Sequence, residues 1–456
     1  MLRNFVAAAA VTLMIVGAAP DAVIAATREI NIYGSVESLY PFIKDFLISK
    51  SCTIAKVEGI EKFDDNHRII VGTNCHNTMA CNSYSGYCYS NDTIVISLTA
   101  APSFNSIKAV NNEGDPEYYY LDYCLAPNER RVATYNPDQT EFDPYGNLAL
   151  DCRDIQLGIS DLPSDGFLQI SSGRKHGPNN STYNPLISRN LITNPVDQSG
   201  LITYNPLVVP FAPFLSKNVT MKTCDGGGNS GEMCISAEDC PDSTCSAKEL
   251  DNISREMLVQ IFSGNAWYWS DFGAGFPDAP ITICMRHAGS GAHAMLDHAI
   301  MHNQWGAGLA SAESAADPII WFNDSSSDMM KCITNFQTTD ADDTSWYAIG
   351  YAKADWLENV GPGYAPYAYS PKYNGFKATR VNIRNGIYDW WSNQWMYVVP
   401  GESTNNRIVI RALVDFISNP ANIHDRYWAT QAEMVWDKGD DFHYPTYRGT
   451  DYPQSP

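Results

Sequence analysis

Basic residues are scarce in this sequence: 30 lysines and arginines stand against 51 aspartates and glutamates, giving a formal net charge of −21 at pH 7. Nucleic-acid phosphates require a basic face, so this composition argues against a nucleic-acid partner. Long apolar runs are missing as well, because no stretch after residue 26 approaches ~18 uninterrupted apolar residues. We therefore expect a chain that does not span a membrane. A small anion stays compatible with this charge, since surface carboxylates are screened within roughly 10 Å.

Signatures of cofactor and metal chemistry are also missing. The sequence has no Cys-x-x-Cys-His for attached haem and no His-Glu-x-x-His for catalytic zinc. His298 and His302 have a spacing that could hold a metal on a helix, beside His293 and Asp297. The apolar stripe of this segment leaves them on a solvated or interlobe face, so we expect no metal and no cofactor.

The N-terminal segment and the cysteines indicate export. Residues 1–25 combine a short basic start, an apolar stretch and small residues at the end, which predicts a secretory signal peptide. The 12 cysteines of an exported chain suggest up to six disulfides. We expect Cys124–Cys152 and Cys284–Cys332 as local pairs. The protein is therefore predicted to be periplasmic or secreted.

The chain is organised around Arg286 and the Gly-Ser-Gly turn at 289–291. The apolar run 279–285 predicts a strand, and apolar residues at helical spacing from Ala292 onward predict a helix. Glycines let the backbone approach a ligand, the first helical N–H groups attract anions, and the arginine adds a fixed positive charge. The pattern favours an anion site, and a plain Gly/Ser turn with a salt-bridged arginine is the alternative.

Other strand ends carry polar side chains. Residues 93–99 predict a strand before a turn that contains Ser103, and residues 154–163 contain a strand whose end presents Ser160 and Asp161. The segment 207–216 is apolar but broken by prolines, which indicates a chain crossing between domains and argues against a central strand.

In this order the segments resemble the periplasmic phosphate-binding proteins of bacterial ABC importers, a branch of the type 2 substrate-binding proteins. The segments that carry the resemblance are Gly34 to Pro41, the Ser103 turn, Gly158-Ile-Ser-Asp161, Ile261-Phe-Ser-Gly264 with Trp269-Ser-Asp271, Arg286-x-x-Gly-Ser-Gly291 and Ala348-Ile-Gly-Tyr351. They span most of residues 28–420, with large insertions at 60–92, 111–150 and 222–248.

The resemblance implies an α/β fold of two lobes with the ligand in the cleft between them. Lobe 1 is expected at 26–208 and again, as a return segment with a C-terminal helix, at 389–456. Lobe 2 is expected at 209–388. The ligand-binding residues that the resemblance implies are Ser38, Leu39 through its N–H, Ser103, Ser160, Asp161, Arg286, Ser290, Gly291 and Ala292.

Two positions depart from the family pattern. Ala292 stands where the family usually has threonine, which removes a hydroxyl donor. Ala288 stands where it often has aspartate, which removes a partner that would orient Arg286. Asp161 would serve as the acidic acceptor, because a desolvated carboxylate repels a fully ionised anion but accepts a hydrogen bond from a protonated one. A helix N-cap is the alternative role for Asp161.

The predicted function is an exported substrate-binding protein that binds phosphate or a related small oxyanion, with the permease of an ABC importer as its expected partner. We do not expect an enzyme, since Ser290 lacks a nucleophile elbow and no partner base is evident. A phosphatase-like enzyme on the same fold, and an extracellular binding or structural protein without a transport role, are the alternatives.

Overall fold

The computed structural model describes residues 26–36, 39–58, 67–76, 90–113, 124, 126–135, 150–167, 169–175, 187–192, 194–301, 320–335, 346–438 and 446–447. The predicted signal peptide at 1–25 lies outside these residues, as does much of the predicted insertions at 60–92 and 111–150.

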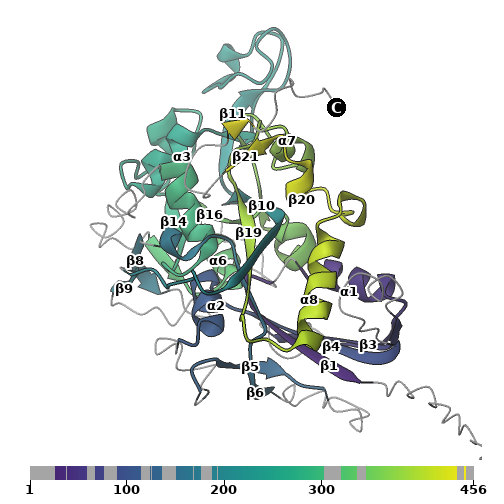
Figure 1. Ribbon diagram of the computed structural model, residues 1–456. Coiled ribbons are helices and arrows are strands. Elements are labelled where there is room, and N and C mark those ends of the chain that lie inside the picture. The colour runs from purple at the N-terminus through teal and green to yellow at the C-terminus, as the bar shows by residue number, and fades with distance from the viewer. Residues whose placement is uncertain are drawn as a thin grey trace, which may run out of the picture.

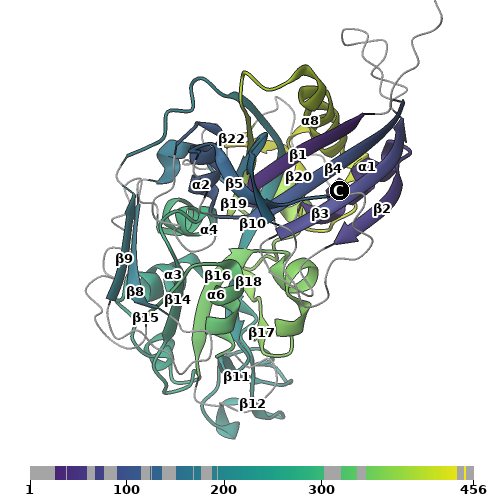
Figure 2. The same ribbon diagram turned by 90° about the horizontal axis from the view of Figure 1, so that it is seen from below.

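A single long mixed sheet of 14 strands runs through the molecule (Figures 1 and 2). Its main path, in spatial order, is β2 (Thr53–Glu58), β3 (His67–His76), β4 (Ser90–Ala100), β1 (Thr27–Gly34), β7 (Leu157–Ser160), β19 (Trp391–Val398), β10 (Ile202–Ser216), β16 (Ala348–Lys353), β14 (Thr282–Arg286), β15 (Ile320–Asn323), β8 (Gln169–Lys175) and β9 (Ile187–Ile192). Two short strands, β17 (Ala368–Tyr369) and β20 (Ala429–Thr430), pair with β10 beside this path.

The long strand β10 joins two halves of the sheet. Its first part pairs with β19, from Ile202↔Val398 to Pro210↔Trp391, and its second part pairs with β16, beginning at Phe211↔Lys353. We call the strands from β2 to β19 the first half and those from β16 to β9 the second half. Since β10 belongs to both, the halves meet along one continuous strand near the centre of the molecule (Figure 2).

Parallel pairing places several strand ends at one edge in each half. In the first half β1 is parallel to both β4 and β7, and in the second half β14 is parallel to both β15 and β16. Ligands of open α/β sheets bind outside the carboxyl ends of such strands. The topology therefore predicts that a ligand would bind beside the residues that follow these six strands.

Helices cover both halves. In the first half, α1 (Tyr40–Ser49) packs beside α8 (Thr404–Ile417), with the Phe46 and Phe416 rings 5.9 Å apart (Figure 1). The other helices among the described residues are α2 (Ser103–Val110), α3 (Arg255–Phe262), α4 (Gly291–Met295), α6 (Ser326–Ile333) and α7 (Arg380–Arg384). Short 3-10 and π turns are η2 (Ser164–Phe167), η3 (Ala237–Asp239), η4 (Trp269–Phe272), η5 (Leu296–Met301), η7 (Trp356–Val360), η8 (Pro362–Tyr364), η9 (Pro420–Asn422) and η10 (Gln431–Glu433).

Four small strand pairs complete the fold. They are β5 (Glu129–Ala133) with β6 (Leu150–Asp154), β11 (Thr220–Cys224) with β12 (Cys245–Glu249), β13 (Asn252–Ile253) with β18 (Lys372–Tyr373), and β21 (Trp436–Asp437) with β22 (Thr446–Tyr447). The hairpin of β11 and β12 projects from the end of the second half (Figure 2).

The capping of the helices differs by location. The first turns of α3, α6 and α8 are each capped by a serine hydroxyl, from Ser254, Ser325 and Ser403 respectively. By contrast, α2 and α4 begin after Pro102 and Ser290 without a side-chain cap. A helix start that lacks such a cap leaves N–H donors for another partner.

The strand pairing differs from the sequence prediction at two places. The segment 207–216 is part of β10 and is a central strand, so the prediction that its prolines argue against one was wrong. The prolines fit because the backbone groups around them are still paired. The Phe211 N–H donates to the Trp390 carbonyl, and the Pro210 carbonyl accepts a hydrogen bond from the Ala354 N–H. In addition, β8 and β9 fall within predicted lobe 1 but pair in the second half, next to β15. The lobe boundaries themselves stay a prediction.

The disulfides follow the predicted framework. Cys124–Cys152 and Cys284–Cys332 are both bonded, which confirms these two pairs. The remaining described bonds are Cys52–Cys75, Cys224–Cys240 and Cys234–Cys245. Among the described residues, no helix combines the length and the apolar character needed to cross a bilayer.

Candidate functional site

A small polar cavity lies where the two halves of the sheet meet. The residues that line it are Ser35, Ala101, Pro102, Ser103, Asp161, Arg286, Ser290, Gly291, Ala292, Ser326 and Lys353. Its volume is about 20 Å³, and one buried water requires about 10–15 Å³. The cavity in this conformation therefore has room for a group of a few atoms and none for a larger organic molecule.

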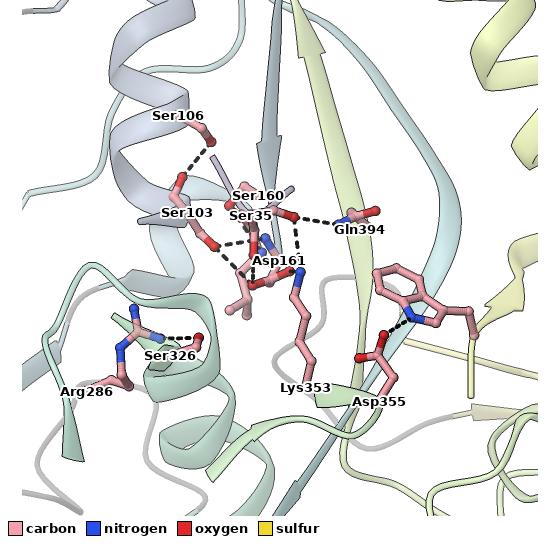
Figure 3. Close-up of polar contacts among 12 residues, drawn as sticks. Ser35, Ser103, Ser106, Ser160, Asp161, Arg286, Ser326, Lys353, Asp355 and Gln394 are labelled. Atoms are coloured by element: carbon pink, nitrogen blue, oxygen red, sulfur yellow. Dashed lines mark hydrogen bonds and ion pairs between the residues drawn. The ribbon is translucent and has the colours of Figure 1, made fainter. Parts of the chain in front are cut away.

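Asp161, directly after β7, is the acidic centre of the cavity and is only 2% exposed. Its Oδ2 atom accepts hydrogen bonds from the hydroxyl of Ser35 at 2.7 Å and from that of Ser103 at 3.1 Å (Figure 3). Its Oδ1 atom lies 3.5 Å from Nζ of Lys353. One carboxylate thus contacts the segments that follow β1 and β4 and the end of β16.

Lys353, the last residue of β16, brings a buried positive charge from the second half to the first. Its Nζ donates to the backbone carbonyl of Ser35 at 3.0 Å and lies 5.5 Å from the centre of the Trp428 ring. Gln394 donates to the same Ser35 carbonyl at 3.2 Å. These contacts hold the ammonium group at the cavity. The residue as a whole is only 4% exposed.

Arg286, the last residue of β14, is a second buried cation and has a different set of partners. Its guanidinium donates to the Ser326 hydroxyl at 2.7 Å (Figure 3). It also donates to the Asp324 backbone carbonyl at 3.1 Å. Its Nε atom is buried without a hydrogen-bond partner, and no described carboxylate forms an ion pair with this side chain. An unpaired buried charge costs several kcal/mol of desolvation, so this arginine favours an anion beside it.

The turn at 289–291 brings the second half into close contact with the first. A Cβ atom at Gly291 would lie 2.4 Å from Oδ2 of Asp161 and 2.7 Å from Oγ of Ser103, so only glycine fits here. The Phe104 N–H, in the first turn of α2, donates across to the Gly289 carbonyl at 3.2 Å. The uncapped starts of α2 and α4 therefore reach the cavity from opposite halves.

The neighbouring His287 adds no further charge. Its Nδ1 atom accepts a hydrogen bond from the Gly289 N–H at 3.2 Å. Burial, reinforced by the nearby positive charge of Arg286 and by His293, lowers the pKa of His287 well below its usual value. The imidazole is therefore neutral near pH 7, and the charged groups that line the cavity are Asp161, Arg286 and Lys353.

Six of the nine predicted site residues line this one cavity: Ser103, Asp161, Arg286, Ser290, Gly291 and Ala292. Ser38 lies outside the described residues. Leu39 and Ser160 do not line the cavity, and each has its own partner. The Leu39 N–H donates to the Val36 carbonyl at 2.9 Å, and the Ser160 hydroxyl donates to the Leu162 carbonyl at 2.6 Å.

Three lining residues with polar side chains, Ser35, Ser326 and Lys353, were not predicted. Each lies within three residues of the end of a parallel strand, after β1, after β15 and at the end of β16. A search for polar residues at every strand end would have included all three. The two motifs that do identify the site, around Asp161 and Arg286, contain none of them.

The helix that follows the turn corrects one prediction. His293 and Asp297 are fully buried, not solvated, because α4 and η5 pack inside the molecule. Nδ1 of His293 lies 2.6 Å from the Tyr351 hydroxyl. His298 does lie between the halves, where its Nε2 atom is 2.8 Å from the Gly166 carbonyl of η2. His302 lies outside the described residues.

In the part of the chain that the structure describes, Cys224, Cys234 and Cys240 are the one group whose possible ligand atoms lie close enough together to hold a metal ion. All three are disulfide-bonded, so their sulfur atoms are not thiolate ligands.

A two-part α/β sheet with a polar cavity at the carboxyl ends of its parallel strands is the architecture of a ligand-binding cleft. Comparison with known families agrees with this class. Residues 239–420 match the family described as the PBP superfamily domain. The match covers this stretch of the chain, and it confirms the predicted resemblance and the α/β fold class at the level of the superfamily.

The comparison with solved structures includes matches from three bacteria. A Clostridium perfringens protein assigned to phosphate ABC transport as its substrate-binding component, solved with bound phosphate, is 12% identical, with a TM-score of 0.41 over 85% of this chain and 93% of that one. PstS from Borrelia burgdorferi is 12% identical, with a TM-score of 0.31 over 85% and 97%. An ABC-type phosphate transport receptor from Vibrio cholerae is 12% identical, with a TM-score of 0.30 over 54% and 73%.

Proposed function

We propose that this protein is an exported substrate-binding protein that binds phosphate or a related small oxyanion in the cavity between the two halves of the sheet. The observation that carries the proposal is Arg286. It is 7% exposed, its hydrogen-bond acceptors are neutral, and its Nε atom has no partner. A small anion in the adjacent cavity would supply the missing negative charge.

The donors around the cavity suit an oxyanion. The hydroxyls of Ser290 and Ser326 line it beside Arg286, and the N–H groups of Gly291 and Ala292 begin an uncapped helix. Charge-assisted hydrogen bonds from a guanidinium, hydroxyls and helix N–H groups are the usual means of holding such anions. The small cavity volume of about 20 Å³ favours a small inorganic ion as the ligand in this conformation.

The two halves would act as lobes that close on the ligand. Contacts that join them at the cavity include the Lys353–Asp161 ion pair and the Phe104 to Gly289 hydrogen bond. A ligand clamped there stabilises the closed form by its differential affinity for that form.

Export is part of the proposal. The described disulfides favour an oxidising compartment, because cytosolic thiols are kept reduced. We place the protein in the periplasm or outside the cell and infer that it passes its anion to the permease of an ABC importer. The protein would bind its ligand without turning it over.

Calorimetry of the purified mature protein against phosphate, sulfate, arsenate and a few organic acids tests this function. We expect the inorganic oxyanions to bind and Arg286→Ala to lose roughly 2–5 kcal/mol of binding free energy. Arg411→Ala is the matched control, because that arginine forms a surface ion pair with Asp415 and should leave binding unchanged. Parent-like binding by Arg286→Ala would contradict the site, and steady turnover of a chromogenic phosphate ester would favour an enzyme.

A further inference from the structure

We propose that Lys353 determines the charge class of ligand that the cavity accepts. Because it neutralises Asp161, the cavity should take fully ionised tetrahedral oxyanions of the sulfate type as well as phosphate, which keeps a proton at neutral pH. This inference rests on the proposed function, namely anion binding in this cavity.

The formal charges around the cavity leave a positive excess. The charged groups that line the cavity are Arg286, Lys353 and Asp161, so their formal sum is one positive charge. Without Lys353 the sum would be zero, and an unneutralised carboxylate would face the anion. Such a carboxylate discriminates strongly, because only a ligand that brings a proton can hydrogen-bond to it.

The charge of Asp161 is offset by its surroundings. Oδ2 accepts hydrogen bonds from the hydroxyls of Ser35 and Ser103. Oδ1 is buried without a hydrogen-bond partner, but it lies 3.5 Å from the ammonium group of Lys353, which forms an ion pair with it. A protonated ligand oxygen can still approach Oδ1, but an unprotonated one no longer meets an uncompensated negative charge. The carboxylate therefore penalises a fully ionised anion much less than an isolated aspartate would.

Lys353 is fixed in position and, among the described residues, has one N–H donor without a protein acceptor. A lysine ammonium has three N–H donors. One is directed to the Ser35 carbonyl at 3.0 Å, and the Oδ1 atom of Asp161 lies within ion-pair distance. The Trp428 ring packs against the ammonium group, and almost complete burial prevents the side chain from turning to solvent. The remaining donor is available to a ligand oxygen.

The test compares the dissociation constants of phosphate and sulfate by calorimetry at neutral pH and constant ionic strength. For the parent protein we expect the two constants to agree within about tenfold, whereas a site whose carboxylate is not offset by a cation should discriminate by roughly 10⁴-fold. In Lys353→Met, which keeps an apolar stem of similar length, sulfate should weaken by at least about tenfold more than phosphate. Lys353→Arg should restore the parent ratio.

Lys372→Met is the matched control, because Lys372 forms an exposed ion pair with Asp251 and should change neither constant. Asp161→Asn provides a second test that does not depend on the folding of the Lys353 variants. Since Lys353 already offsets this carboxylate, the amide should keep the phosphate-to-sulfate ratio within about tenfold of the parent.

The outcomes separate this inference from the proposed function. If phosphate binds the parent roughly 10⁴-fold more tightly than sulfate, or if Lys353→Met weakens both anions equally, Lys353 does not set the selectivity, although the anion site stands. If Asp161→Asn strongly changes the phosphate-to-sulfate ratio, the carboxylate sets the selectivity even though Lys353 offsets its charge, and the inference is wrong. If neither anion binds the parent protein, the proposed function itself fails.

Discussion

Replacing Gly291 with alanine tests whether the contact between the two halves belongs to the ligand-bound form. The added Cβ atom would lie 2.4 Å from Oδ2 and 2.5 Å from Cβ of Asp161, and 2.7 Å from Oγ of Ser103. Optimal contacts between carbon atoms are about 3.5–4.0 Å. The α4 turn would therefore have to move away from Asp161 by roughly 1 Å, and the halves would not close fully.

The expected cost falls on the closed form alone. Overpacking a well-packed contact costs typically about 1–3 kcal/mol, which corresponds to a loss of phosphate affinity of roughly 5- to 150-fold. The open form should tolerate alanine well, because alanine is the best helix former and this residue begins α4. The unliganded protein should thus keep its melting temperature while its phosphate affinity falls.

Calorimetry with phosphate and X-ray scattering with and without saturating phosphate would measure both effects. The parent protein should become more compact with phosphate, and Gly291→Ala should compact less. Gly363→Ala is the control, since a Cβ atom there would meet no atom within 4 Å. If Gly291→Ala bound phosphate and compacted like the parent, the contact of α4 with Asp161 would not belong to the bound form.

The remaining predictions concern the fold. Replacing Cys284 and Cys332 by serine removes a disulfide with a sequence separation of 48. The free energy of unfolding should fall by about 4 kcal/mol. Urea titration would measure this loss, and an unchanged midpoint would contradict it. Thiol counting on denatured, unreduced protein should find no more than two free thiols, because the five described bonds account for all but two of the 12 cysteines. Burial raises the pKa of Asp355, so the folded form binds this proton more tightly and loses stability as pH rises through the raised pKa. Asp355→Asn should remove that loss; an equal pH dependence of both proteins in denaturant titrations would refute it.

Local sequence patterns identified the parts of the site that depend on a few neighbouring residues. The strand, turn and helix around Arg286 appear as β14 and α4, and Ser103 and Asp161 follow strand ends as expected. These predictions succeed because a strand that ends in polar residues carries its own signal, and because parallel strands gather such ends at one edge.

The features of the site that the sequence did not predict depend on the pairing and packing of elements that lie far apart in the chain. Lys353 ends an ordinary apolar strand, and its side chain becomes important only because β16 pairs with β10 and so lies next to the first half. The prolines of β10 argued against a central strand, since the hydrogen-bond partners of their neighbours on adjacent strands are invisible in the sequence, although β10 does cross from one half to the other as expected. His293 is buried for a similar reason, because the packing of α4 against other elements covers its polar face.

The site repeats one construction in both halves. Ser103, Ser35 and Asp161 follow the parallel strands β4, β1 and β7. In the second half, Arg286 and Lys353 end the strands β14 and β16, and Ser326 follows β15. The first half contributes the carboxylate and the second half contributes both cations. Because Lys353 pairs with the carboxylate while Arg286 meets only neutral acceptors, the proposed attraction for an anion would reside chiefly in Arg286. Substitutions at Arg286 should therefore reduce the affinity for every oxyanion, and substitutions at Lys353 should change which oxyanion binds.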